Sequence, residues 1–195
     1  MTGTLRVVVT GTGGGVGTTT IAAALFAYLA GPAGPVPCLG DRTGGELLLR
    51  IPAYFGSRPV DEALIIQDLG CHATSAVLLG LLDEPVLLVV VTAATPDGLR
   101  LADEFVGRLP RRARLGTVVV PVAVFGRQRI EAQLAAMLLA GLPMLFPVPS
   151  DRVLAAGGPI RFESLAPGTT TALVSVASQV RELLGTSVTV RPLTW

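Results

Sequence analysis

The sequence predicts an α/β protein built on a single doubly wound, mostly parallel sheet that is flanked by helices on both faces. Short apolar runs alternate with helix-like segments along the whole chain, which is the pattern of such a fold. The runs are continuously Val- and Leu-rich, as in parallel strands that are buried on both faces. A glycine-rich loop, GTGGGVGTTT (Gly11–Thr20), lies between the first strand and the first helix. Strand, glycine loop and helix together are the setting of a phosphate-binding P-loop.

The predicted strands share a short, apolar and often β-branched composition, and each ends at a turn or before a helix. In chain order they are Leu5–Thr10, Val36–Gly40, Ala63–Asp68, Val86–Thr92, Leu115–Val124 and Met144–Val148. The residues Ser187–Val190 are predicted to form an edge strand or an ordered tail. Ligands of parallel sheets bind at the carboxyl ends of the strands, so the segments that follow these strands are the candidate site.

The predicted helices lie between the strands and are either rich in Ala and Leu or amphipathic at helical spacing. In chain order they are Thr18–Ala30, a single turn at Gly45–Arg50, Thr74–Leu82, Pro96–Leu109, Ile130–Ala140 and Thr169–Leu184. The clearest is Pro96–Leu109, with Leu99, Ala102, Phe105 and Val106 on one side and Arg100, Asp103 and Glu104 on the other. The turn after the first helix is GPAGP (Gly31–Pro35), since Gly and Pro interrupt helices.

Composition limits the class of protein. The 195 residues suffice for one core, and a single domain over residues 1–195 is expected. Half of the residues are hydrophobic and mean hydropathy is +0.64. However, the longest apolar tract, Ala76–Ala94, is interrupted at residues 83–85, and neither part reaches the ~20 residues that span a bilayer. No secretory leader is visible, so a cytoplasmic location is expected. The net charge of +1 argues against strong nucleic-acid binding.

The glycine loop resembles a family motif. GGGVGTTT (Gly13–Thr20) is similar to the deviant Walker A motif KGGVGKTT of the MinD/ParA ATPases, P-loop proteins of the SIMIBI class. Gly13 and Thr18 stand where that family has its two signature lysines. All 15 basic residues of this chain are Arg, but a lysine needed for chemistry would survive such a bias because one of its codons ends in G. The loss at Thr18 is therefore informative.

Four further segments resemble the family in the same order along nearly the whole chain. They are LGDRTGGELL (Leu39–Leu48), IIQDLG (Ile65–Gly70), EPVLLVVVTAATPDGLRLA (residues 84–102) and FPVPSDRVLAAGGPI (Phe146–Ile160). The resemblance implies a degenerate MinD/ParA-like member, and pilus-assembly scaffolds of the TadZ/CpaE type look nearest. It also implies a homodimer and a protein partner. The closing SVTVRPLTW is not expected to form the membrane-binding C-terminal helix of MinD, so any membrane association is expected to be peripheral, through that partner.

The implied ligand is ATP or ADP with Mg²⁺. The implied nucleotide-binding residues are Gly13, Gly14, Gly15, Val16, Gly17, Thr18, Thr19 and Thr20, with Pro149 and Asp151 at the base pocket. Thr19 would offer its hydroxyl to Mg²⁺, and Asp68 would hold the metal through water. Asp41 matches the residue that orients the attacking water. Backbone amides can bind phosphates whichever side chain stands at position 18.

The missing lysines predict weak chemistry. One cationic side chain can be worth ~10³–10⁵ in the rate of phosphoryl transfer, so the loss of two should suppress hydrolysis strongly and weaken binding less. Arg42 is a candidate replacement for the lost charge.

Each candidate also has a purely structural alternative. The glycine loop can be a turn retained only for folding, and Asp68 can be a strand-end or capping carboxylate. Asp41 can stabilise the turn before Gly44–Gly45, and Asp151 can cap a helix at Arg152–Ala156. These alternatives stay open at the level of sequence.

Two further groups carry weaker signals. Cys71 and His72 form a chemically suggestive pair but lack further partners for metal or nucleophile chemistry. Arg108, Arg111, Arg112 and Arg114 form a basic cluster, for which a solvated surface and a contact with an anionic partner are the two interpretations.

The sequence thus predicts a nucleotide-binding or pseudo-ATPase scaffold that dimerises across its P-loop edge and recruits a partner in positioning, secretion or pilus assembly. One alternative is an active ATPase that uses Arg42 or an arginine of another chain. Another is a nucleotide-free interaction module, in which side chains such as Leu39 or Phe146 would fill the phosphate or base position. A third alternative is a ligase related to dethiobiotin synthetase. Those enzymes also keep the P-loop lysine, so Thr18 counts against this alternative as much as against an active ATPase.

Overall fold

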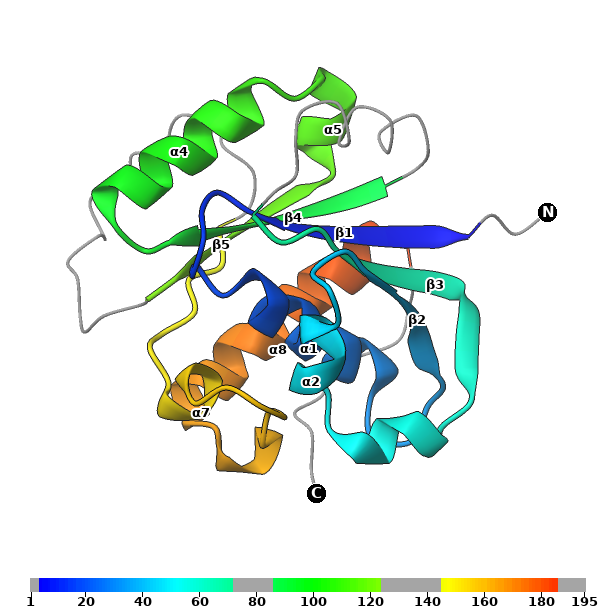
Figure 1. Cartoon of the computed structure of the whole chain (residues 1–195). Helices are drawn as coiled ribbons and strands as arrows, with labels where there is room; N and C mark the ends of the chain where they lie inside the picture. Colours follow the sequence, from blue (N-terminus) through cyan, green and yellow to red (C-terminus); the bar gives the residue numbers. More distant parts are fainter. Residues whose placement is uncertain (1–3, 72–85, 124–144, 186–195) are drawn as a thin grey trace.

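The structure, a computed structural model, describes residues 4–71, 86–123 and 145–185. In these ranges five strands form one parallel sheet in the order β2-β3-β1-β4-β5 (Figure 1). The strands are β1 (Leu5–Gly11), β2 (Val36–Asp41), β3 (Val60–Asp68), β4 (Val86–Ala93) and β5 (Thr117–Val122). The predicted α/β class with a parallel sheet is confirmed.

Helices cover both faces of this sheet. On one face lie α1 (Thr18–Ala30), α2 (Glu46–Arg50), α7 (Arg152–Ala155) and α8 (Pro167–Leu183); on the other lie α4 (Pro96–Gly107) and α5 (Arg111–Leu115) (Figure 1). Short 3₁₀ helices at Ala53–Ser57 and Phe162–Ser164 were not expected from the sequence. Among the described helices none is long and apolar enough to span a bilayer.

The side chains of β1 show how the sheet separates two hydrophobic cores. Val7 and Val9 are fully buried in the core that contains α1 and α8, whereas Val8 is buried in the core beneath α4. Successive strand residues point to opposite faces, so the valine run serves both cores. Every residue of α1 from Ile21 to Ala30 is buried, which explains why this part of the helix is apolar all round instead of amphipathic.

The strand predictions needed three corrections. Strand β3 begins at Val60 and not at Ala63. Val60 and Asp61 pair with Val36 and Pro37 of β2, and a register shift follows. The charged residues of this segment do not resemble a strand, so the sequence did not predict this part. Leu115 belongs to α5, so β5 begins only at Thr117, after Gly116 has ended the helix.

The third correction concerns the predicted strand Met144–Val148. Beside β5, Leu145 and Val148 each form a single parallel bridge, with Val119 and Val122, and no continuous ladder joins them. Met144 lies outside the described residues, as do the predicted helices at residues 74–82 and 130–140 and the tail at 187–190.

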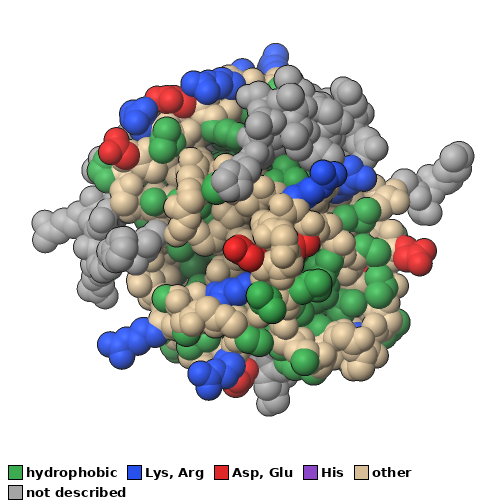
Figure 2. All heavy atoms as spheres, viewed as in Figure 1, with side chains coloured by type: hydrophobic (Ala, Val, Ile, Leu, Met, Phe, Trp, Pro, Cys, Tyr) green, Lys and Arg blue, Asp and Glu red, His purple; other side chains and the backbone are tan. Residues whose placement is uncertain are grey.

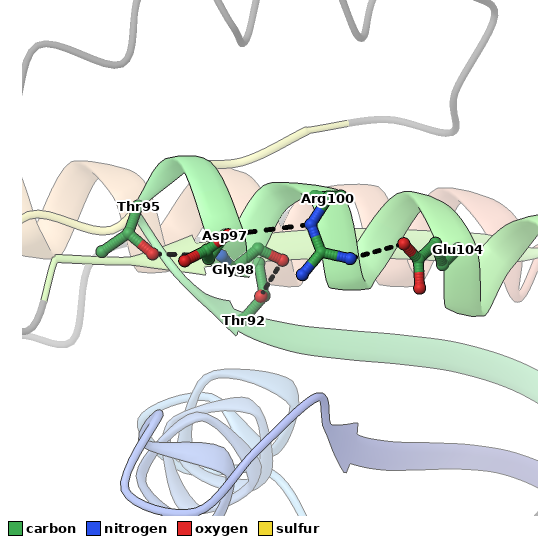
Figure 3. A network of polar contacts seen from close by, with 6 residues as sticks. All are labelled: Thr92, Thr95, Asp97, Gly98, Arg100 and Glu104. Atoms are coloured by element: carbon green, nitrogen blue, oxygen red, sulfur yellow. Dashed lines mark hydrogen bonds and ion pairs between the residues drawn. The ribbon is translucent and has the colours of Figure 1, made fainter.

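The start of α4 is fixed by a polar network at the end of β4 (Figure 3). Thr95 caps the helix, since its hydroxyl accepts a hydrogen bond from the backbone N–H of Gly98 at 3.0 Å. The hydroxyl of Thr92 donates to the carbonyl of Gly98 at 2.6 Å. On the outer side, Arg100 forms ion pairs with Asp97 and Glu104. The network holds the carboxyl end of β4 next to the glycine loop.

Candidate functional site

The glycine loop joins β1 to α1 in the way that a P-loop does. Gly15 and Gly17 have positive φ angles of 75° and 89°, which only glycine adopts without strain. Gly17 is the N-cap of α1; it makes no side-chain cap, and the first turn contains no acidic residue. The first turn of α1 therefore supplies no anion of its own to offset the positive end of the helix dipole, and its backbone N–H groups can bind one from a ligand.

Thr18, at the position of the missing lysine, is buried. The residue is only 6% exposed. A Cβ atom at Gly11 would lie 2.2 Å from Thr18 Oγ1, and one at Gly13 would meet nothing within 4 Å. The base of the loop is thus tightly packed, whereas its crest at Gly13 is open.

Two adjoining cavities lie over the loop. The larger, about 490 Å³, is lined by Gly13, Gly15, Gly17, Thr18, Thr19 and Thr20 together with residues of α2 and of the segment after α7. The smaller, about 300 Å³, is lined by Val16, Pro149 and Asp151 and shares Gly15, Gly17 and Thr20 with the first. All the sequence-predicted nucleotide residues except Gly14 line one of the two, so the structure brings together segments that are 130 residues apart in sequence.

Asp68 is the last residue of β3, two residues before Gly70, which lines the larger cavity. It is fully buried. Its Oδ1 accepts from the backbone N–H of Gly70 at 2.8 Å, while Oδ2 has no hydrogen-bond partner among the described residues. Burial raises the pKa of this carboxyl; the Gly70 N–H and the Thr19 hydroxyl oppose the rise, and the charges of Asp41 and Glu46 add to it. A buried carboxylate with an orphaned oxygen lacks a cation.

These residues fit a Mg²⁺ ion that arrives with a phosphate ligand. Magnesium in nucleotide sites is held by one or two protein groups and by phosphate oxygens, and Asp68 with Thr19 supplies such a pair. No cluster of three or more His, Cys, Asp or Glu in the described ranges could hold a metal ion. The site therefore fits a metal that comes with its ligand and not one in an all-protein cage.

Asp41 and Asp151 have the structural partners that the alternative interpretation predicted. Asp41 Oδ1 accepts from the backbone N–H of Thr43 at 2.7 Å and from the Thr43 hydroxyl, and Oδ2 accepts from Leu47 N–H at 3.2 Å. Asp151 Oδ1 caps α7 by accepting from Val153 N–H at 2.8 Å. Its Oδ2 accepts from the N–H of Ala166 at 2.9 Å. Both carboxylates stabilise turns, and the water-orienting role of Asp41 stays a prediction.

Sequence reasoning missed Arg50, the last residue of α2. This side chain is 8% exposed and lines the larger cavity. Its Nη1 donates to the Gly158 carbonyl at 2.9 Å, and Nη2 donates to Thr20 Oγ1 at 2.9 Å and to the Leu154 carbonyl at 2.6 Å. The predicted candidate, Arg42, is exposed and is not among the residues that line this cavity. Spacing would have identified Arg50: it follows the buried Leu47 by three residues, on the same helical face.

The remaining candidates are less informative. Cys71 is half-buried and lines the larger cavity, while His72 lies outside the described residues. In the basic cluster, Arg108 and Arg111 are exposed and Arg114 donates to the Leu109 carbonyl at 2.8 Å. The side chain of Arg112 is not described.

Leu39 and Phe146 fill neither cavity. Both pack against the core beneath α1 and are absent from the linings of the two cavities. These two side chains therefore do not block the phosphate or base position, as a nucleotide-free module would have required of them.

Surface composition differs across the face that carries the site (Figure 2). Acidic and basic side chains lie near the middle, and hydrophobic side chains gather over α2, β2 and β3. The exposed large hydrophobic residues of this region include Leu48 and Leu49 of α2, which are 61% and 68% exposed, and Val60 of β3. Leu49 also lines the larger cavity.

Known structures share the fold of this chain. A ParA family ATPase from Chlorobium tepidum TLS aligns over 88% of this chain and 98% of its own, with a TM-score of 0.63 and 16% identity. A chain of the MinC:MinD cell division protein complex of Aquifex aeolicus aligns over 98% of this chain and 98% of its own, with a TM-score of 0.59 and 18% identity. No protein-family model matches the sequence, and a search of curated proteins finds no relative. At these identities the likeness shows the fold, and the chain has the MinD/ParA-like P-loop fold that its sequence predicts.

Proposed function

We propose that the chain is a nucleotide-binding scaffold that takes ATP or ADP with Mg²⁺ over its glycine loop and hydrolyses ATP slowly or not at all. The observation that carries the proposal is the buried carboxyl of Asp68, whose Oδ2 has no hydrogen-bond partner among the described residues. This carboxyl lies next to Thr19, which belongs to the uncapped first turn of α1 and lines the larger cavity. A loop retained only for folding has no need of a buried carboxylate oxygen without a partner, because such an atom costs free energy.

Each half of the ligand has a matching part of the site. The backbone N–H groups of residues 13–18 would hold the phosphates, and Thr19 and Asp68 would hold Mg²⁺, which neutralises phosphate charge when it is bound. The base would enter the smaller cavity beside Pro149. Asp151 contributes the shape of that cavity, since both of its carboxylate oxygens already accept backbone hydrogen bonds.

Weak hydrolysis follows from positions 13 and 18. Gly13 has no side chain, and the short Thr18 side chain is packed against Gly11. Neither supplies a mobile cation to the transition state, where one such charge is worth ~10³–10⁵ in rate. Backbone amides and Mg²⁺ remain, so binding should persist.

The same proposal includes a homodimer and a protein partner in cellular positioning, secretion or pilus assembly. The exposed Leu49, which lines the larger cavity, and its exposed neighbour Leu48 support it, because apolar side chains at a ligand-binding edge can be covered when two copies meet. The MinD of the Aquifex structure is in a complex with MinC, which supports a protein partner for this fold.

Calorimetric titration of ATP and ADP, with Mg²⁺ and with EDTA, tests the proposal on wild type and on Thr18→Lys. Micromolar, magnesium-dependent binding by wild type is expected. Binding only by Thr18→Lys would indicate a vestigial site in an intact loop. Binding by neither would leave an interaction module. Magnesium-dependent phosphate release at an ordinary ATPase rate would support the active-enzyme alternative instead.

Because Thr18 is buried, a second variant is needed. Gly13→Lys restores the other signature lysine at a position where an added side chain meets nothing within 4 Å. Circular dichroism should show both variants folded before titration. Asp68→Asn, which keeps an acceptor for Gly70, should remove the magnesium dependence of ADP binding and leave metal-free binding in place.

A further inference from the structure

The side chain of Arg50 is a buried cation with no anion. The three groups that accept hydrogen bonds from it are neutral: the carbonyls of Leu154 and Gly158 and the hydroxyl of Thr20. Within the described ranges no carboxylate forms an ion pair with it. Glu46, one turn earlier on α2, lies exposed at the rim of the same cavity. Burial lowers the pKa of Arg50 with no opposing acid, yet guanidinium stays charged in proteins, and buried charges are normally paired.

Arg50 contacts α1 at the end of the helix where a positive charge is disfavoured. Thr20, which accepts from its Nη2, belongs to the first turn of α1. That is the positive end of the helix dipole, where a cation is disfavoured. Arg58 offers the natural comparison, because it bonds the carbonyls of Ala30, Gly31 and Gly34 at the C-terminal end of the same helix. There a cation is favoured, so the helix end offsets the charge of Arg58, although its buried Nε has no hydrogen-bond partner among the described residues. No such offset exists for the charge of Arg50.

The guanidinium also has donors to spare. It carries five N–H groups, and these three hydrogen bonds use one on Nη1 and both on Nη2. They do not use the second Nη1 hydrogen or the Nε hydrogen. Thr20 and the two carbonyls fix the plane of the group, so these donors are held in place at the wall of the cavity that Gly13, Gly15 and Thr19 also line.

We propose that Arg50 binds the phosphate chain of the ligand and supplies the positive charge that the loop lost with its lysine. The inference rests on the proposed function and deepens it. It assigns the larger cavity to a di- or triphosphate and not to a monophosphate, because a fixed guanidinium opposite an amide-lined helix terminus provides two separate sites for negative charge. Arg50 is a binding residue; its ties to α7 and α1 hold it too rigidly to follow a transferring phosphoryl group, which agrees with slow chemistry.

The competing explanation is that Arg50 only joins α2 to α1 and to the segment after α7. Titration of ADP, AMP and inorganic pyrophosphate into wild type, Arg50→Met and Arg50→Lys separates the two. Arg58→Met is the matched control. It also removes a guanidinium that makes three hydrogen bonds, here to carbonyls, but Arg58 is not among the residues that line the cavity. Unfolding of each variant is measured in parallel without ligand.

If Arg50 binds phosphate, Arg50→Met should weaken ADP and pyrophosphate binding about 10- to 100-fold, the range expected for a charge-assisted hydrogen bond. It should also reduce the preference for ADP over AMP, a ratio that a merely structural role would not change. Arg50→Lys should retain most of the preference. Arg58→Met should lose stability but keep wild-type affinity within about threefold.

Two results would overturn the inference in distinguishable ways. Equal ADP affinity and an unchanged ADP-to-AMP ratio in folded Arg50→Met would show that Arg50 is structural while the nucleotide site stands. No binding of ADP or pyrophosphate by wild type would remove the proposed function itself. Should Arg50→Met not fold, Arg50→Gln keeps donors for the two carbonyls without the charge and is read by the same criteria.

Discussion

The hydroxyl of Thr12, in the glycine loop, donates a hydrogen bond to the hydroxyl of Thr92, and the two oxygens lie 2.8 Å apart. The direction follows from proton count: Thr92 has a single hydroxyl hydrogen, and that hydrogen is donated to the Gly98 carbonyl. The hydrogen bonds from Thr12 to Thr92 and from Thr92 to Gly98 therefore connect the loop to the first turn of α4; Figure 3 shows the second of them. The loop and α4 are expected to be stabilised together.

The first prediction concerns this connection. Thr92→Val keeps the shape of a fully buried side chain but leaves the Thr12 hydroxyl and the Gly98 carbonyl without their partner. The free energy of unfolding should fall by about 1–3 kcal/mol, as for an unsatisfied buried polar group. Urea denaturation of wild type and variant measures it. Thr171→Val, which removes an exposed hydroxyl bonded to the Pro167 carbonyl, should change stability by less than about 0.5 kcal/mol.

The second prediction concerns the packed base of the loop. Gly11→Ala would place a Cβ atom 2.2 Å from Thr18 Oγ1 and 3.0 Å from Val16 Cγ2, so it should cost about 1–3 kcal/mol of stability. Gly13→Ala, two residues on, meets nothing within 4 Å and should be nearly neutral. Adding Thr18→Ala to Gly11→Ala should recover part of the loss. Additive effects of the two substitutions in a double-mutant cycle would contradict this packing.

A third prediction is the pH dependence contributed by Asp151. Burial alone would raise the pKa of its carboxyl, but hydrogen bonds from the backbone of Ala166 and Val153 outweigh burial and hold the pKa below its ordinary value. The group therefore stabilises the fold above the ordinary carboxyl pKa of about 4, and this contribution is lost as pH falls through the lower native pKa. Asp151→Asn should be less stable than wild type near neutral pH and lose that deficit in acid.

Measurement of unfolding free energy for both proteins between about pH 2 and pH 7 checks the sign. The exposed Asp103 of α4 offers Asp103→Asn as a control for the general effect of removing one negative charge. A stability difference between wild type and Asp151→Asn that grows on acidification would contradict the assignment of Asp151 as an ionised cap.

The fourth prediction tests the proposed dimer. Leu48→Glu combined with Leu49→Glu should prevent a dimer that forms in ATP and Mg²⁺, because two charges would be buried without partners. Both side chains are mostly exposed, so monomer stability should hardly change. Sedimentation velocity with and without nucleotide measures the effect. Leu101→Glu, on α4 and 40% exposed, is the control that should leave assembly intact; a dimer that survives the double substitution would place the interface elsewhere.

Much of the fold was predictable because it depends on residue type. The valine run of β1 and the Ala-rich α1 were placed to within a residue, since apolar composition and glycine boundaries determine both. The failures occurred where tertiary pairing overrides composition. Asp61 and Glu62 are charged and yet lie within β3. The RRARL segment of α5 is a different case, because Arg, Ala and Leu favour helices and only the shortness of the segment hid it.

The candidate site was predictable only in part. Loop residues were found through their glycines, and the capping roles of Asp41 and Asp151 were anticipated as alternatives. The orphaned oxygen of Asp68 and the position of Arg50 were not, because both depend on which segments distant in sequence meet at the sheet edge. Adjacency to Asp41 predicts Arg42 as the replacement cation, whereas helical spacing from Leu47 points to Arg50.

The two cavities over the loop meet along a shared wall formed by Gly15, Gly17, Thr20, Leu154 and Ala155. For inhibitor design this wall is the natural place to join fragments. An acidic fragment seated against Thr19 and Arg50 and an apolar ring beside Pro149 would point toward each other across Leu154. A short tether between them converts the second contact into an intramolecular one and raises affinity without any new contact, so compounds that carry no phosphate ester become reachable ligands for this chain.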